Sequence, residues 1–153
     1  MPTPPRTGDL RAQLPIVGVI ALGGGIGSVL RYGLAWAVPA AHGGFPVATL
    51  ITNLLGSLLL GALVVAVTEI WRPHRLVRPA FGTGLLGGFT TFSTFAVDTR
   101  ALALPVAVAY AVATVAGGLV LAAVGIAVVR RLEQRLQVAP VHELVDPFDP
   151  DLP

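Results

Sequence analysis

The sequence contains no cysteine and no lysine, and it is poor in charge of either sign. Without cysteine, the chain has no disulfide framework, thiol nucleophile or thiolate metal site. Without lysine, Schiff-base and lysine-base chemistry are excluded. Charged residues make up 12% of the 153 residues, whereas about a quarter is usual in soluble domains. Because 54% of the residues are hydrophobic, the expected solvent for most of the surface is lipid.

Acids and metal ligands are also scarce where function would need them. Glu69 and Asp98 lie at the ends of apolar stretches, and proton-coupled exporters need an acid deep inside the membrane. His42, His74 and His142 are far apart and show no metal-ligand spacing. No nucleophile, base and orienting group converge in the sequence, so we expect no enzyme. The pI near 9.9 rests on a net charge of only +2, which gives no indication of a nucleic-acid partner.

The chain does have long apolar runs. Each of four runs is long enough to cross a hydrocarbon core of about 30 Å as a helix, and together they predict an all-α membrane protein. The expected spans are about 15–38, 46–68, 79–97 and 104–129, which make up a channel domain at 15–130. Residues 1–14 are expected to be a disordered lead. Residues 131–153 are expected to be a cytoplasmic, disordered tail, although residues 130–137 can continue the last helix.

The arginines are distributed unequally between the two sides of the predicted membrane. The N-terminus, the second loop and the C-terminus share eight of them, whereas the opposite side has only Arg100. Positively charged loops stay in the cytoplasm, so both termini are predicted to be cytoplasmic. The eight are Arg6, Arg11, Arg72, Arg75, Arg78, Arg130, Arg131 and Arg135.

The third apolar run has an unusual centre, where Gly87-Gly88 is followed by Phe89 and Thr90-Thr91. Glycine and threonine are poor helix formers, which predicts a helix broken in mid-span. A broken backbone inside a membrane is tolerated where it is buried in protein or lines a site. The alternative is a continuous glycine-rich helix that packs closely on its neighbours.

Other polar residues lie on the faces of the predicted helices. Asn53 belongs to a stripe with a four-residue period in the second run, and it is either a bond between helices or a donor that faces an anion. Tyr110 and Thr114 form a similar track in the fourth run, and Gly118 follows at the same spacing. Arg31 is the one charge deep in a span. It can extend to the interface, attract anions or anchor a loop.

Three stretches together resemble the small bacterial fluoride channels of the Fluc family. They are Gly23–Tyr32 (GGGIGSVLRY), Thr49–Ser57 (TLITNLLGS) and Gly84–Phe95 (GLLGGFTTFSTF). The resemblance implies a passive, fluoride-selective channel in the bacterial plasma membrane. It also implies an antiparallel dimer of four-helix subunits with two narrow pores.

The resemblance assigns roles to individual residues. Phe92 and Phe95 correspond to the aromatic pair beside the fluoride path, and Asn53 to the pore asparagine. The carbonyl groups of Gly87 and Thr90 are the expected ligands of a structural sodium ion shared by the two subunits. Arg31 corresponds to the arginine of the first helix. Hydroxyl groups along the path are expected from Ser93, Thr94, Tyr110 and Thr114, and Gly118 departs from that pattern.

Two alternatives to a self-sufficient channel stay open. The chain is either a subunit that does not conduct or conducts only with a related partner, or a small drug or cation exporter. The strong arginine asymmetry favours a partner of opposite orientation, because an antiparallel homodimer requires one chain to insert both ways.

Overall fold

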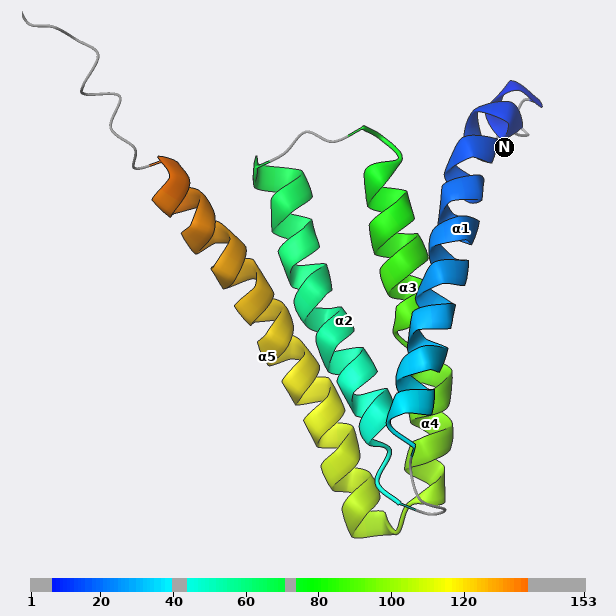
Figure 1. Ribbon diagram of the computed structural model, residues 1–153, viewed down its shortest axis with the longest axis vertical. Coiled ribbons are helices and arrows are strands. Elements are labelled where there is room, and N and C mark those ends of the chain that lie inside the picture. Colours follow the sequence, from blue (N-terminus) through cyan, green and yellow to red (C-terminus); the bar gives the residue numbers. More distant parts are fainter. Residues whose placement is uncertain (1–6, 40–43, 71–73, 138–153) are drawn as a thin grey trace, which may run out of the picture.

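The computed structural model describes residues 7–39, 44–70 and 74–137, which form helices and connecting loops. The chain reverses direction repeatedly: α1 descends, α2 ascends, the segment from η2 to α4 descends, and α5 ascends (Figure 1). The helices are α1 (Thr7–Ala37), α2 (Val47–Val65), η1 (Ala66–Ile70), η2 (Arg78–Leu86), α3 (Gly87–Phe89), α4 (Phe92–Ala101) and α5 (Leu104–Gln137).

Among the described residues, three helices are long and apolar enough to cross a membrane, and they cover Gln13–Ala37, Val47–Ile70 and Leu104–Leu136. This confirms the predicted all-helical, multi-pass membrane protein. The run predicted at 79–97 lies in the shorter helices η2, α3 and α4. Residues in the final part of the predicted tail, 138–153, lie outside the described residues.

Helix α1 begins earlier than the sequence indicated. The lead predicted to be disordered over residues 1–14 is helical from Thr7 onward, and residues 1–6 lie outside the described part. The segment from Leu10 to Leu14 consists of good helix formers. Pro15 interrupts the backbone hydrogen bonding only locally, so the helix continues through it. Helix α5 likewise continues to Gln137, as the sequence allowed.

The helices form two closely packed pairs, α1 with η2 and α3, and α2 with α5. Glycines allow close backbone contact between the helices in both pairs. A Cβ atom added to Gly27 would collide with the backbone of Leu85 and Phe89, and one added to Gly61 would collide with the backbone of Ala122. Small residues that let helix backbones approach closely are characteristic of packing in membranes.

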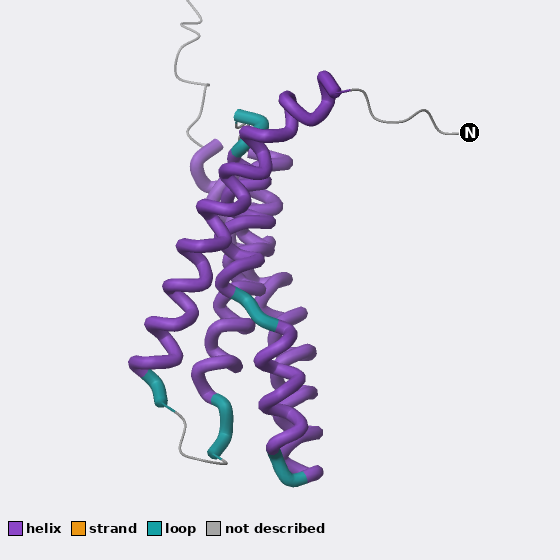
Figure 2. Tube along the Cα trace, turned by 90° about the vertical axis from the view of Figure 1, so that its right-hand side faces the viewer, coloured by secondary structure: helices purple, strands orange, loops and turns teal. Residues whose placement is uncertain are grey.

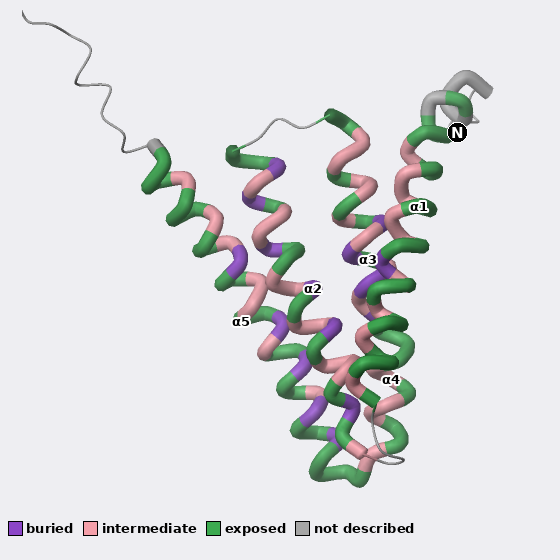
Figure 3. The backbone as a smooth tube through the Cα atoms, viewed as in Figure 1, coloured by how far each residue is buried: buried purple, intermediate pink, exposed green. Residues whose placement is uncertain are grey.

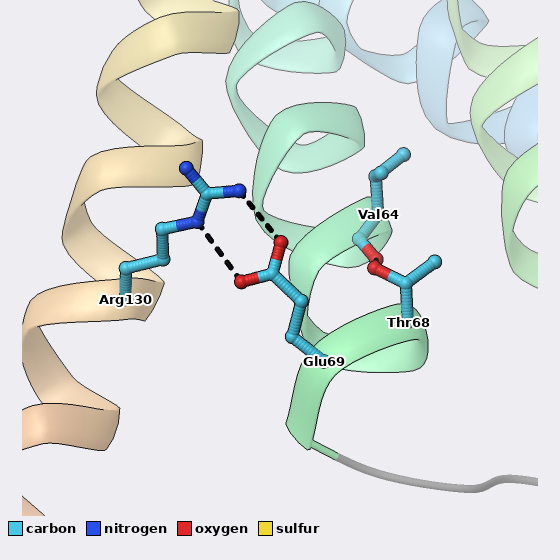
Figure 4. Close-up of polar contacts among 4 residues, drawn as sticks. All are labelled: Val64, Thr68, Glu69 and Arg130. Carbon is cyan, nitrogen blue, oxygen red and sulfur yellow. Dashed lines mark hydrogen bonds and ion pairs between the residues drawn. The ribbon is translucent and has the colours of Figure 1, made fainter.

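The two pairs meet near α4 and diverge toward the end where α5 terminates (Figure 1). At that end Arg130 of α5 and Glu69 of η1 form an exposed ion pair, with Nε–Oε2 and Nη2–Oε1 distances of 2.9 and 2.6 Å (Figure 4). This pair joins α5 to the end of the α2–η1 segment where the molecule is most open.

Buried residues are few and are found where helices touch, while the outward faces are exposed (Figure 3). Large apolar side chains such as Leu22, Trp36 and Leu119 are 70–79% exposed. A soluble monomer rarely exposes large apolar surfaces. These faces therefore fit contact with lipid or with another subunit.

Candidate functional site

The centre of the site is an interruption between α3 and α4, visible as a short loop halfway along the molecule (Figure 2). Thr90 and Thr91 have extended backbones, with φ/ψ of −72°/160° and −150°/122°. The Thr90 N–H still donates to the Leu86 carbonyl at 2.9 Å, so the helical bonding ends there. The interruption thus falls on the Thr-Thr pair, directly after the Gly-Gly-Phe segment.

The side chain of Asn53, on α2, makes two hydrogen bonds to the extended backbone of Thr91. Its Nδ2 donates to the Thr91 carbonyl at 3.0 Å, and its Oδ1 accepts from the Thr91 N–H at 2.9 Å. In a continuous helix that N–H would donate to the Gly87 carbonyl. The Asn53 side chain therefore provides hydrogen-bond partners for the N–H and the carbonyl of Thr91. The Gly87 carbonyl is left without its helical donor.

Thr91 also starts the next helix. Its Oγ1 accepts from the Thr94 N–H at 3.1 Å and donates to Thr94 Oγ1 at 3.0 Å, while Ser93 Oγ lies 3.3 Å away. This is an N-cap, in which a threonine hydroxyl satisfies a free amide in the first turn. Thr91 is not among the predicted site residues, although threonine is one of the residues preferred at an N-cap.

Arg31 of α1 binds Thr90, the other residue of the interruption. Its Nη1 donates to the Thr90 carbonyl at 3.1 Å. The positive charge therefore lies beside the carbonyl end of η2 and α3, where a helix dipole favours a cation. Of the roles that the sequence left open, this contact supports an anchor for the irregular segment.

A groove of about 480 Å³ lies between the two helix pairs, beside the break. Asn53, Thr90 and Thr91 contribute polar groups to its wall, and none of the described residues that line it is charged. The Thr114 hydroxyl, also in the wall, donates to the Tyr110 carbonyl at 2.8 Å. The groove is also lined by Ser57, Gly87, Phe92, Phe95 and Gly118.

An aromatic series runs inward from this groove. The ring centroids of Phe92 and Phe95 are 5.8 Å apart, and those of Phe95 and Tyr110 are 5.3 Å apart. Phe92 is 80% exposed, whereas Tyr110 is fully buried. The Tyr110 hydroxyl makes no hydrogen bond within the described parts of the chain, although Thr49 and Thr114 are its neighbours. The hydroxyls of Thr49 and Thr114 are therefore the described groups that lie nearest to the Tyr110 hydroxyl.

A second cavity of about 230 Å³ lies between α1, α2 and the start of α4, and Arg31, Thr49 and Thr94 line it. Thr49 donates to Asp98 Oδ2 at 2.7 Å, a contact that the sequence did not indicate. The structure therefore divides the predicted site. In the 480 Å³ groove it brings together Asn53, Gly87, Thr90, Phe92, Phe95 and Thr114, whereas Arg31, Ser93, Thr94 and Tyr110 do not line it.

Comparison with known proteins identifies the family. A family described as CrcB-like protein, Camphor Resistance (CrcB), matches residues 18–126. The chain is 52% identical over 97 residues to the Fluoride-specific ion channel FluC 2 of Streptomyces avermitilis. The aligned region covers 63% of this chain and 61% of that protein. It is 50% identical over 115 residues to FluC 1 of Streptomyces coelicolor, covering 72% and 74%.

A further relative is FluC 3 of Streptomyces avermitilis, 47% identical over 92 residues, covering 60% of this chain and 45% of that protein. The match thus spans between under half and about three quarters of the length of these relatives. The region matched by the family includes the interruption at Thr90 and Thr91, and also Arg31 and Asn53, whose side chains hydrogen-bond to it. The chain belongs to the CrcB-like family.

Proposed function

We propose that the chain is a subunit of a fluoride-selective channel through which fluoride leaves the cell passively. The names of the three relatives, all fluoride-specific ion channels, support this. The structural observation that carries the proposal is the groove, whose wall combines neutral hydrogen-bond donors with two phenyl rings and, among the described residues, has no charge. It is a route for an ion rather than a site for a reaction.

The chemistry of this wall suits a small, strongly hydrated anion. A pore must replace the hydration shell, yet it must bind weakly enough for the ion to leave. Asn53 uses one Nδ2 proton on the Thr91 carbonyl, and the amide has a second to offer. Ring edges carry partial positive charge, so Phe92 and Phe95 can stabilise an anion without holding it as a full cation would.

We propose that the segment from η2 to α4 is a fourth, interrupted membrane crossing, and that two subunits pack antiparallel across their grooves. The groove is open along one side, and the exposed Phe92 lines it beside the break. A second subunit would cover this apolar wall and turn a groove into a narrow path. The exposed apolar faces elsewhere would meet lipid.

The Gly87 and Thr90 carbonyls are the proposed ligands of a sodium ion between the subunits. The Gly87 carbonyl has lost its helical donor, because the Thr91 N–H donates to Asn53. The Thr90 carbonyl accepts from Arg31 and retains a second lone pair. Hard cations prefer such oxygen ligands. A bound cation would join two irregular backbones without any acidic side chain.

The partner subunit is proposed to be a related chain rather than a copy. Eight arginines on one side against Arg100 on the other favour one orientation. Two of the relatives are numbered channels of one organism, FluC 2 and FluC 3 of Streptomyces avermitilis. A partner with the opposite arginine bias would complete the antiparallel dimer.

Efflux from proteoliposomes tests the function directly. We expect fluoride to leave vesicles that contain the protein, with its partner where one is required, while chloride and nitrate are retained. Equal fluoride and chloride flux would contradict the proposal. Reporters fused to the C-terminus, each active on one side of the membrane, test the orientation. Signal from both sides in equal measure would restore the homodimer.

A further inference from the structure

Ser57 lies one helical turn after Asn53 on α2 and lines the same groove. It faces a gap in the neighbouring helix. On α5 the hydroxyl side chains of Tyr110 and Thr114 recur every fourth residue, but the next residue at that spacing is Gly118. A Cβ atom built on Gly118 would lie 3.1 Å from Ser57 Oγ and 3.9 Å from Ser57 Cβ. The serine hydroxyl therefore occupies the place next to α5 where the missing side chain would begin.

The proton of this hydroxyl is available. Within the parts of the chain that the structure describes, Ser57 makes no hydrogen bond. Helical serines and threonines often donate back to the carbonyl four residues earlier, and five threonines here do so at 2.7–2.9 Å. These are Thr52, Thr68, Thr90, Thr99 and Thr114. Thr114, the nearest hydroxyl on the α5 track, has thus already committed its proton, whereas Ser57 has not.

We propose that Ser57 is a fluoride-binding residue of the pathway, and that it supplies from α2 the hydroxyl donor that α5 lacks at Gly118. The proposal rests on the channel function proposed above. It gives the ion two successive donors on one helix, the Asn53 amide and the Ser57 hydroxyl, about 6 Å apart along the axis. At this level the path follows α2 rather than α5.

Moving the hydroxyl from one helix to the other tests this assignment. Ser57→Ala removes the donor, and we expect fluoride efflux to fall about fivefold, the loss expected for one hydrogen bond. Ser57→Ala with Gly118→Ser places a hydroxyl on α5, and the 3.9 Å spacing to the Cβ of residue 57 leaves room for the new side chain. We expect this double variant to recover efflux to within about twofold of the unmodified protein.

The matched control is Ser57→Ala with Gly118→Ala, which fills the same space without a hydroxyl. Efflux that stays low in this control supports the proposal, provided that the size-exclusion profiles of all variants agree. Unchanged efflux in Ser57→Ala, or equal recovery by Gly118→Ala and Gly118→Ser, would overturn the role of Ser57 and leave the channel function standing. If the unmodified protein with its partner carries no fluoride, both proposals fail.

Discussion

The two helix pairs use the same packing device but serve different purposes. In both, glycines bring backbones into direct contact, through Gly27 in the α1 pair and Gly61 in the α2–α5 pair. Helices α2 and α5 are regular through this contact. The chain opposite α1 instead forms a π-helix over Arg78–Leu86, and after the three residues of α3 it is interrupted at Thr90. The regular pair thus supports an irregular segment.

The difference shows how a membrane protein can keep an open backbone in place. The interruption lies where the two pairs meet, and each pair contributes one side chain to it. Arg31 from α1 holds the Thr90 carbonyl, and Asn53 from α2 holds both polar groups of Thr91. Unsatisfied backbone groups are costly in lipid, so the break depends on both partners.

The glycine contacts should give the largest effects. Gly27→Ala and Gly61→Ala each place a Cβ atom against backbone that cannot move aside, and overpacking of this kind costs about 3 kcal/mol or more. We expect both variants to lose most of the monodisperse protein on size exclusion. Gly33→Ala is the control, because no heavy atom lies within 4 Å of the added Cβ. Normal yields of the Gly27 and Gly61 variants would show that the helices do not approach so closely.

The second largest effect should come from removing the hydrogen bonds between Asn53 and the Thr91 backbone. Asn53→Leu leaves the Thr91 N–H and carbonyl without their partners, which costs about 1–3 kcal/mol of stability. We also expect fluoride efflux to fall at least about tenfold, equal to about 1.4 kcal/mol, because a donor is lost from the path. Thermal unfolding in detergent and vesicle efflux measure the two effects. Thr68→Val removes only an exposed bond to the Val64 carbonyl and should change neither.

The two phenylalanines should separate conduction from stability. Phe92→Ile and Phe95→Ile should each reduce fluoride efflux about tenfold or more while the dimer still forms, because a ring edge is lost from the path. Phe95 also packs on the buried Tyr110, whereas Phe92 is 80% exposed. Phe95→Ile should therefore lower the free energy of unfolding by about 1 kcal/mol more than Phe92→Ile. Unaltered efflux in both variants would exclude the rings from the pathway.

The amino-acid sequence predicted the helical, multi-pass class because apolar runs of this length have few other uses. It also singled out Asn53, Phe92, Phe95 and Thr114, which line one groove. Local patterns did not predict that α1 begins at Thr7, although the good helix formers Leu10–Leu14 follow within its first two turns. Composition alone predicted disorder there.

Hydrogen bonds between helices that are distant in the chain could not be predicted from the sequence. The bonds from Asn53 to Thr91 and from Arg31 to Thr90 join residues 38 and 59 positions apart. The absence of a hydroxyl at Gly118 was visible, but its replacement by Ser57 depends on how α2 and α5 pack. Such contacts are set by helix crossing rather than by the periodicity of either helix.

The smallest effect should come from the ion pair at the open end of the α2–α5 pair. Arg130 and Glu69 are exposed, with side chains 54% and 40% accessible, and an exposed ion pair contributes little to stability because water and salt screen it. Glu69→Gln and Arg130→Gln should therefore lower the thermal stability slightly and equally, less so at high salt. Glu69→Arg with Arg130→Glu should restore most of the loss. A large drop in the unfolding temperature of either single variant would instead make this contact a main determinant of the packing of α2 on α5.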